Sequence, residues 1–230
     1  MSVQPLVKTT FSGKLFLSYL NELRALVGEK SVLMVLRKSG ALGNIRDIVS
    51  TRHEKITPPQ ALVAINQCIE DIFGETSLRT VVYNAAKMSF RSSFGETAMI
   101  KEASNWIQSH PQSPLRLRAS LETISYLMES TSDQKVHLDE SSSHYHVVVQ
   151  NCIACYGLAE QHSRYCYYNV GLIRGGLHLL FGKDDYPVQE LACVTNGDDV
   201  CEFIVRKFPF SDNERGSGKT GFLSLPAHLR

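Results

Sequence analysis

The sequence of 230 residues has little that would direct it to a membrane or to a polyanion. Its 24 basic residues nearly balance its 23 acidic ones, and a formal charge of +1 gives no strong field to attract nucleic acid or anionic lipid. Its longest apolar runs, such as residues 32–36 and 145–149, are far shorter than the ~20 residues of a membrane helix. The N-terminus lacks the apolar core and cleavage site of a secretory signal. We therefore expect a cytoplasmic protein that does not bind nucleic acid.

Two signatures of nucleotide chemistry are also missing. The sequence contains no Gly-x-Gly-x-x-Gly fingerprint of a dinucleotide site. The stretch from Gly216 to Thr220 resembles the end of a phosphate-binding loop, but Asn213 stands where that motif requires its first glycine. Without a nucleotide or hydride-donor motif, an NTPase or a nicotinamide enzyme is not supported. We favour a binding role over an enzymatic one.

Apolar periodicity changes near residue 130 and predicts an α+β fold, with a helical N-terminal part packed on a twisted antiparallel sheet. Before this point, apolar residues recur at three- and four-residue intervals and predict helices over residues 14–27, 29–37, 58–74, 77–94, 96–109 and 115–130. After it, β-branched and aromatic residues predict strands over residues 144–155, 187–194 and 200–207, with a helix over residues 164–181. Residues 43–57 predict a loop with a short helix, and residues 131–143 are polar.

The chain is expected to form a single ligand-binding domain over residues 10–208. Its helical part covers about residues 10–130, and its sheet and metal part covers about residues 131–208. Asn196-Gly197 predicts a hairpin between the last two strands. Gly171 and Gly175 are four residues apart on a predicted helix, which favours close packing against another backbone. Residues 209–230 are rich in Gly, Ser and Pro and predict a flexible tail.

Cysteine is unevenly distributed, because five of the six cysteines lie between Cys152 and Cys201. In a reducing compartment such residues are thiols or metal ligands rather than disulfides. Three thiolates and one carboxylate suit a closed, structural zinc site, and the predicted hairpin would bring three of these side chains together. The candidate zinc ligands are Cys166, Glu190, Cys193 and Cys201. The sixth cysteine, Cys68, lies on the apolar stripe of a predicted helix and is expected in the core.

Other arrangements of the cysteines remain open. Cys152, Cys155, His162 and Cys166 have the spacing C-x2-C-x6-H-x3-C, which approximates a zinc knuckle. Cys152 and Cys155 alone also match the C-x-x-C spacing of a redox pair. We favour a third interpretation, in which these two cysteines are small buried strand residues outside the metal site.

Aromatic residues gather near the predicted junction between the sheet and the helix after Cys166. Most such tyrosines belong to a core, but a pocket for a flat conjugated ligand is lined by the same residue types. The candidate ligand-binding residues are Tyr145, His146, Tyr167 and Tyr168.

Residues 151–203 resemble the 4-vinyl reductase domain. The match rests on C-x-Y-x-x-G-x-x-x-G from Cys166, E-x-x-C from Glu190, and G-x-x-x-C-x-F from Gly197. The resemblance implies a fold like that of the small subunits of the TRAPP vesicle-tethering complex, the ligand-binding fold of NO signalling and Golgi transport proteins. In the family's aromatic-sensing transcription factors, three cysteines and a glutamate hold zinc. Those ligands correspond to Cys166, Glu190, Cys193 and Cys201.

The resemblance also implies a function. Stand-alone members of the family are linked to chlorophyll synthesis and photosystem assembly, with tetrapyrroles or bilins as ligands. We therefore expect a zinc-stabilised, homodimeric module for a small hydrophobic conjugated ligand, acting as an auxiliary factor in pigment synthesis or with a membrane-protein assembly. Three alternatives stay open: a sensor of aromatic compounds, a reductase of a tetrapyrrole vinyl group, and a ligand-free scaffold.

Overall fold

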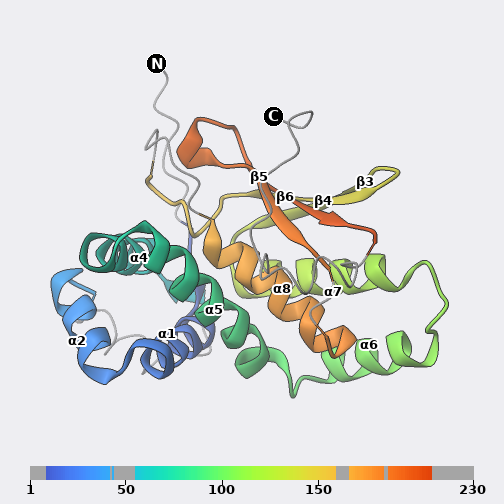
Figure 1. Ribbon diagram of the computed structural model, residues 1–230, viewed down its shortest axis with the longest axis horizontal. Coiled ribbons are helices and arrows are strands. Elements are labelled where there is room, and N and C mark those ends of the chain that lie inside the picture. The colour runs from blue at the N-terminus through green and yellow to red at the C-terminus, as the bar shows by residue number, and fades with distance from the viewer. Residues whose placement is uncertain (1–8, 42, 44–54, 159–165, 184–185, 209–230) are drawn as a thin grey trace.

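The computed structural model describes residues 9–41, 43, 55–158, 166–183 and 186–208. The helices of this part are α1 (Gly13–Val27), α2 (Glu29–Lys38), α4 (Pro59–Phe73), α5 (Glu75–Phe94), α6 (Ala98–Ser109), α7 (Arg116–Thr131) and α8 (Tyr167–Phe181). Figure 1 shows α1, α2 and α4 at one end, the sheet with α6, α7 and α8 at the other, and α5 between them. The predicted α+β class is confirmed. No helix among these residues is both long and apolar enough to cross a membrane.

Single glycines make the two corners of the N-terminal helical part. Gly28 joins α1 to α2 with φ 84°, and Gly74 joins α4 to α5 with φ 81°. These backbone conformations are open essentially only to glycine. The helix stops predicted at both glycines are confirmed, because each corner needs a residue without Cβ.

The main sheet consists of four antiparallel strands in the order β3-β4-β6-β5. Its strands are β3 (Lys135–Glu140), β4 (His144–Gln150), β5 (Val188–Ala192) and β6 (Cys201–Arg206). On β4, Tyr145, Val147 and Val149 are buried while the residues between them are partly exposed, as expected for a strand with one face on the core. Helix α7 packs against β3, and α8 packs against β5.

Several predicted strand boundaries are wrong. The strand expected over residues 144–155 ends at Gln150, because Asn151 adopts φ 54° and starts a series of turns. Residues 131–143, which were described as polar and given no element, contain β3, an edge strand of mostly exposed polar residues. The short β2 (Lys55–Thr57), in a segment predicted as a loop, pairs with β1 (Phe11–Ser12). The predicted short helix of that segment falls largely on residues 44–54, outside the described part.

The hairpin predicted between β5 and β6 is confirmed, because the two strands are antiparallel neighbours. Their connection contains a 3-10 turn over Val194–Asn196, followed by Gly197 at φ 92°.

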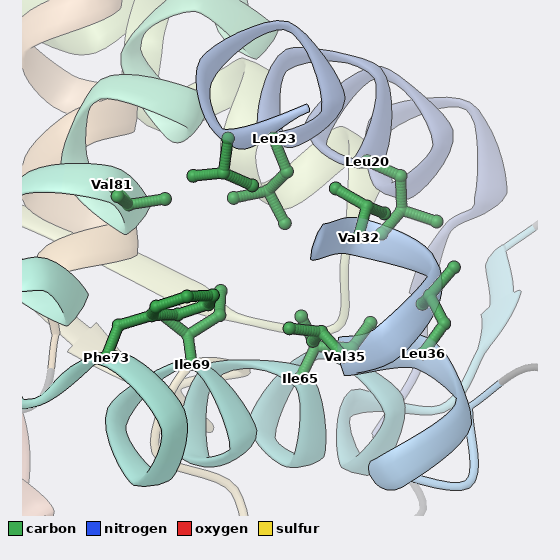
Figure 2. Close-up of a pocket in the computed structure, with 10 residues that line it drawn as sticks. Leu20, Leu23, Val32, Val35, Leu36, Ile65, Ile69, Phe73 and Val81 are labelled. Atoms are coloured by element: carbon green, nitrogen blue, oxygen red, sulfur yellow. The ribbon is translucent and has the colours of Figure 1, made fainter. Parts of the chain in front are cut away.

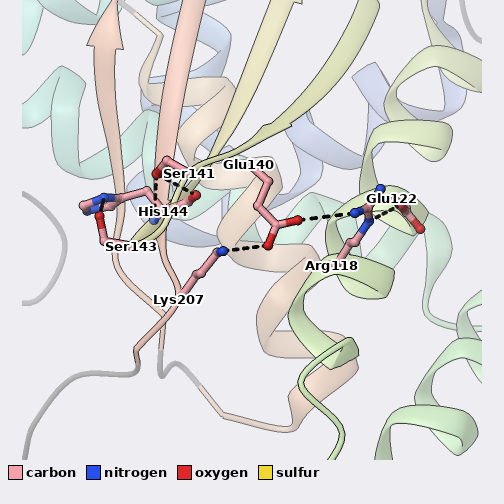
Figure 3. Close-up of polar contacts among 7 residues, drawn as sticks. All are labelled: Arg118, Glu122, Glu140, Ser141, Ser143, His144 and Lys207. Atoms are coloured by element: carbon pink, nitrogen blue, oxygen red, sulfur yellow. Dashed lines mark hydrogen bonds and ion pairs between the residues drawn. The ribbon is translucent and has the colours of Figure 1, made fainter.

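Ion pairs connect the open edge of the sheet to α7 (Figure 3). The carboxylate of Glu140, at the end of β3, lies 2.6 Å from Lys207 Nζ and 3.3 Å from a guanidinium nitrogen of Arg118 on α7. Arg118 also pairs with Glu122, one turn further along α7, at 2.9 Å. Lys207 lowers the pKa of Glu140 below its usual value. Because exposed ion pairs contribute little stability, this network mainly orients the edge of the sheet.

Helix α8 packs closely against α5, where glycine is required on α8. A Cβ on Gly171 would lie 2.5 Å from the carbonyl oxygen of Tyr83 and 2.8 Å from the Cβ of Ala86. A Cβ on Gly175 would clash with the carbonyl oxygen of Lys87. The close packing predicted from the spacing of these two glycines is confirmed.

We predict that Gly171→Ala destabilises the protein by about 1–3 kcal/mol, because the new methyl group must push the α5 backbone away. This cost exceeds the gain of up to about 1 kcal/mol in helix propensity. Thermal unfolding should show a fall of several degrees in Tm. Gly43→Ala is the matched control, since Gly43 is exposed and has open space at its Cβ position. Equal Tm values for the two variants would contradict the close-packing argument.

Candidate metal and ligand site

Five buried cysteines meet where four segments of the C-terminal half converge. Cys152 and Cys155 lie in the turns after β4, and Cys166 directly precedes α8. Cys193 follows β5, and Cys201 is the first residue of β6. We call these five residues the cysteine cluster. Each segment reaches the cluster at its end, where the backbone changes direction and a side chain can point inward.

The sulfur atoms of the cluster are close enough to share one metal ion. Cys166 Sγ lies 2.8 Å from Cys155 Sγ, 3.3 Å from Cys201 Sγ and 3.7 Å from Cys193 Sγ. Cys152 Sγ lies 3.4 Å from Cys166 Sγ. Buried thiolates at such separations repel one another unless protons or a cation lie between them. The donor set is soft and rich in sulfur, which suits Zn or Cu(I) rather than Mg or Ca.

Glu190 also reaches the cluster. Its carboxylate oxygen and the sulfurs of Cys166 and Cys193 all lie within 4.8 Å of one another. The same carboxylate accepts a hydrogen bond from the backbone N–H of Cys166 at 3.3 Å. The structure therefore brings all four predicted zinc ligands into one buried region, and their role as ligands stays a prediction.

The pKa values of the cluster residues and of Glu190 are shifted because these buried side chains lie so close together. Hydrogen bonds from Cys155 and Cys166 lower the pKa of Cys193 to about 6. Burial raises the pKa of Cys166, and burial together with the charge of Cys193 raises the pKa of Glu190. Without a cation, only some of these groups can carry charge together. A divalent metal would favour their deprotonated forms.

Polar residues that sequence reasoning missed hold the cluster in position. Gln134, which is buried just before β3, accepts hydrogen bonds from Ile153 N at 3.2 Å and from Asn169 Nδ2 at 3.4 Å. On the opposite side, Asp198 accepts from Cys193 N at 2.8 Å, and the Thr195 hydroxyl lies 3.0 Å from Cys193 Sγ. Asn169 and Asp198 stand inside the motifs that begin at Cys166 and Gly197, and these motifs were the available signals. Gln134 and Thr195 lie in polar segments without a distinguishing pattern.

The interpretation of Cys152 and Cys155 as buried strand residues is correct for burial and wrong for the strand. Both are buried, at 6% and 3% exposure, but they lie in the turns after β4. These turns place both thiols beside Cys166, as in the alternative set left open above, and they also place Cys155 beside Cys193, which no set drawn from the sequence combined with it. The alternative knuckle-like set depends on His162, which lies outside the described residues. Cys68 is a core residue of α4, as predicted.

The structure does not gather the four predicted ligand-binding residues around one space. Tyr145 is buried beneath Lys207, whose Nζ lies 4.9 Å from the ring centroid. Its neighbour His146 points to the other face of the sheet, where Nδ1 lies 2.6 Å from Glu202 Oε1. Their role in ligand binding stays a prediction.

The other two predicted ligand-binding residues lie on α8. Tyr167 is buried beside Arg79, whose guanidinium carbon lies 5.7 Å from the ring centroid. Tyr168 is fully buried and packs edge-on against Tyr19 of α1, with ring centroids 5.2 Å apart. The Tyr19 hydroxyl donates to Asn66 Oδ1 at 2.7 Å, whereas among the described residues the Tyr168 hydroxyl has no hydrogen-bond partner.

An apolar cleft lies between α1, α2, α4 and α5 (Figure 2). All of its lining side chains are apolar: Leu20, Leu23, Val27, Val32, Val35, Leu36, Ile65, Ile69, Phe73 and Val81. Figure 2 shows these side chains pointing from the four helices toward a common space. The enclosed volume is about 10 Å³, roughly the space of one water molecule. Phe73, with 39% of its surface exposed, marks the side that is open to solvent.

Comparison with solved structures finds a shared fold. The Fe(II) unliganded H-NOX protein from K. algicida has 10% identity and a TM-score of 0.54, over 87% of this chain and 97% of that one. An H-NOX protein from S. oneidensis in the Fe(II)NO ligation state has 11% identity and a TM-score of 0.49, over 84% and 97%. The phenol-responsive sensory domain of the transcription activator PoxR, with phenol, has 16% identity and a TM-score of 0.46, over 71% and 81%.

Sequence comparisons give a narrower result. A comparison with curated proteins finds no match. The family model of the 4-vinyl reductase domain matches residues 145–207. This segment runs from β4 to the end of β6, and it contains the whole cysteine cluster, Glu190 and α8. The resemblance predicted from the motifs is therefore confirmed for residues 145–207, which match the 4-vinyl reductase domain family.

Proposed function

We propose that this chain is a zinc-stabilised module that binds a small hydrophobic conjugated molecule, with tetrapyrroles and bilins as the first ligand class to test. In this proposal the chain delivers or senses its ligand as an auxiliary factor in pigment synthesis or photosystem assembly. The zinc ion holds the C-terminal segments together, and the ligand occupies the apolar cleft between the N-terminal helices. The observation that carries the ligand assignment is this cleft.

The cysteine cluster supports the metal part of the proposal. Cys166, Cys193 and Cys201 come from three different segments, so one ion bound to them would cross-link the start of α8 to β5 and β6. Structural zinc sites are closed, four-coordinate and rich in thiolate. Their binding free energy contributes directly to folding, because the unfolded chain has no preformed site.

The cleft supports the ligand part, because its lining offers only apolar contacts. Leu20 and Ile65 line the cleft, and their sequence neighbours Tyr19 and Asn66 form a buried hydrogen bond at 2.7 Å. Tyr168 packs against Tyr19 and offers a buried hydroxyl for which the described residues provide no partner. An apolar lining with a few polar groups is typical of small-molecule sites.

A ring system enters this cleft only if the helices around it separate. The cleft lies between the α1–α2 corner at Gly28 and the α4–α5 corner at Gly74. Val27 and Phe73, which precede the two glycines, both line the cleft. Small rotations at these corners would widen the space without breaking a helix. A ligand that buries about 400 Å² of apolar surface gains about 10 kcal/mol, and association costs of at least about 4 kcal/mol leave a Kd of tens of micromolar or weaker.

We predict that protein purified without chelator carries one zinc ion per chain and that Cys193→Ser loses it. Because the site contributes to folding, this variant should also lose several kcal/mol of stability. Elemental analysis and thermal unfolding measure the two effects, and chelation of the wild type should likewise lower Tm.

Cys68→Ser is the matched control. Cys68 is 4% exposed and lies in the core of α4, so the substitution introduces a buried hydroxyl without touching the cluster. It should keep the zinc stoichiometry of the wild type. Metal-free wild-type protein, or a Cys193→Ser variant that melts at the same temperature as Cys68→Ser, would disprove the structural role of zinc.

We predict that titration with bilins, protoporphyrin and simple aromatics gives saturable binding in the micromolar range for at least one of them, and that Tyr168→Phe weakens it. The substitution removes only the hydroxyl, so it should leave stability unchanged or slightly raised. If the hydroxyl donates to the ligand, affinity should fall up to about tenfold. Alanine is unsuitable here, because removing a fully buried ring costs about 3–5 kcal/mol.

Tyr126→Phe is the control for this titration, because Tyr126 is 56% exposed on α7. It should bind ligand like the wild type. Absence of saturable binding by all tested compounds would overturn the ligand assignment and favour a scaffold. Equal ligand affinities of the two Tyr→Phe variants would show that the Tyr168 hydroxyl does not contact the ligand.

A further inference from the structure

The geometry points to a metal site made of four sulfurs, those of Cys155, Cys166, Cys193 and Cys201. Cys155 then takes the fourth position, which the sequence motif and the family resemblance give to Glu190. This inference rests on the zinc ion proposed above and changes its ligand set.

The distances among the four sulfurs carry this inference. Cys155 Sγ lies 2.8 Å from Cys166, 3.4 Å from Cys193 and 3.8 Å from Cys201, measured to their sulfurs. All six pairwise distances in the set fall between 2.8 and 3.9 Å. Four sulfurs at about 2.3 Å from one tetrahedral zinc ion are about 3.8 Å apart. The set is thus already gathered around one point, and small outward shifts would make room for the ion.

The chain delivers each corner of this tetrahedron from a different segment. Cys155 comes from the turns after β4, which are held by Ile153 N donating to the buried Gln134 Oε1 at 3.2 Å. The Cys155 carbonyl accepts from Leu158 N at 3.1 Å, which closes the turn behind it. The turns therefore present the Cys155 thiol from a supported backbone. An ion bound there would join this segment to α8, β5 and β6.

Glu190 has a different task in this arrangement. Its carboxylate accepts from the backbone N–H of Cys166 at 3.3 Å and thereby positions a ligand residue. Structural zinc takes four ligands, so four sulfurs leave no coordination position for the carboxylate. Glu190 is then an outer partner that orients Cys166, and its substitution should cost less than loss of a ligand.

The fifth thiol, Cys152, also lies outside the ligand set. Its sulfur is 3.4 Å from Cys166 Sγ and accepts a hydrogen bond from Asn169 Nδ2 at 3.2 Å. A set with Cys152 in place of Cys193 also has its sulfurs within 4.8 Å of one another, but the Cys152 sulfur already accepts the hydrogen bond from the Asn169 amide. Cys152 is therefore the matched control for Cys155: both are buried thiols of the same turns, three residues apart.

X-ray absorption at the zinc edge of the wild-type protein tests the ligand set without any substitution. We expect one shell of four sulfurs at about 2.3 Å. A shell of three sulfurs with one oxygen at about 2.0–2.2 Å would overturn the inference and leave the proposed zinc ion intact. Protein that carries no zinc would overturn both proposals.

Zinc affinities of three variants, measured by competition with a chromophoric chelator, supply the second test. Cys155→Ala should weaken zinc binding by more than ~100-fold, because an outer partner alone accounts for 10–100-fold. Glu190→Gln should stay within ~100-fold of the wild type, and Cys152→Ala should stay within ~10-fold. A Cys155→Ala variant that binds zinc as tightly as Cys152→Ala, or a larger loss in Glu190→Gln than in Cys155→Ala, would overturn the assignment.

Discussion

Helix α8 can take its place only because it approaches α5 without side chains at the point of contact. Gly171 and Gly175 let the α8 backbone lie against the carbonyl oxygens of Tyr83 and Lys87. This contact joins the N-terminal helices to the C-terminal sheet. It also positions Cys166, which directly precedes α8, and Tyr168, which lies within the first turn of α8.

The cysteine cluster shows how sheet topology gathers residues that are distant in sequence. Strand β6 lies between β4 and β5, so the turns after β4 and the connection after β5 emerge at the same end of the sheet as the start of β6. The start of α8 reaches the same place. Five thiols and a carboxylate in one buried region are unfavourable as anions, and a metal ion is the natural counter-charge.

The two proposals concern different parts of the molecule and complement each other. The metal site would make the C-terminal half rigid, because it links separate segments that otherwise rely on a small sheet. The apolar cleft lies in the N-terminal helices, between two corners that each depend on one glycine. Tyr168 connects the parts, since it follows Cys166 by two residues and packs against Tyr19 of α1.

The sequence by itself determined the helices and the α+β class, because apolar periodicity and helix-ending glycines such as Gly28 and Gly74 are local signals. It also singled out the spacing from Cys166 to Cys201, since thiols at such intervals suit a metal. Only the tertiary structure brought Cys155 close to Cys193 and Cys201 as well as to Cys166. It also showed that Lys135–Glu140 form a strand, because these residues pair with β4. Distances between sulfurs on different segments, and a cleft between four helices, arise from packing over long sequence separations. No local pattern of residues encodes them.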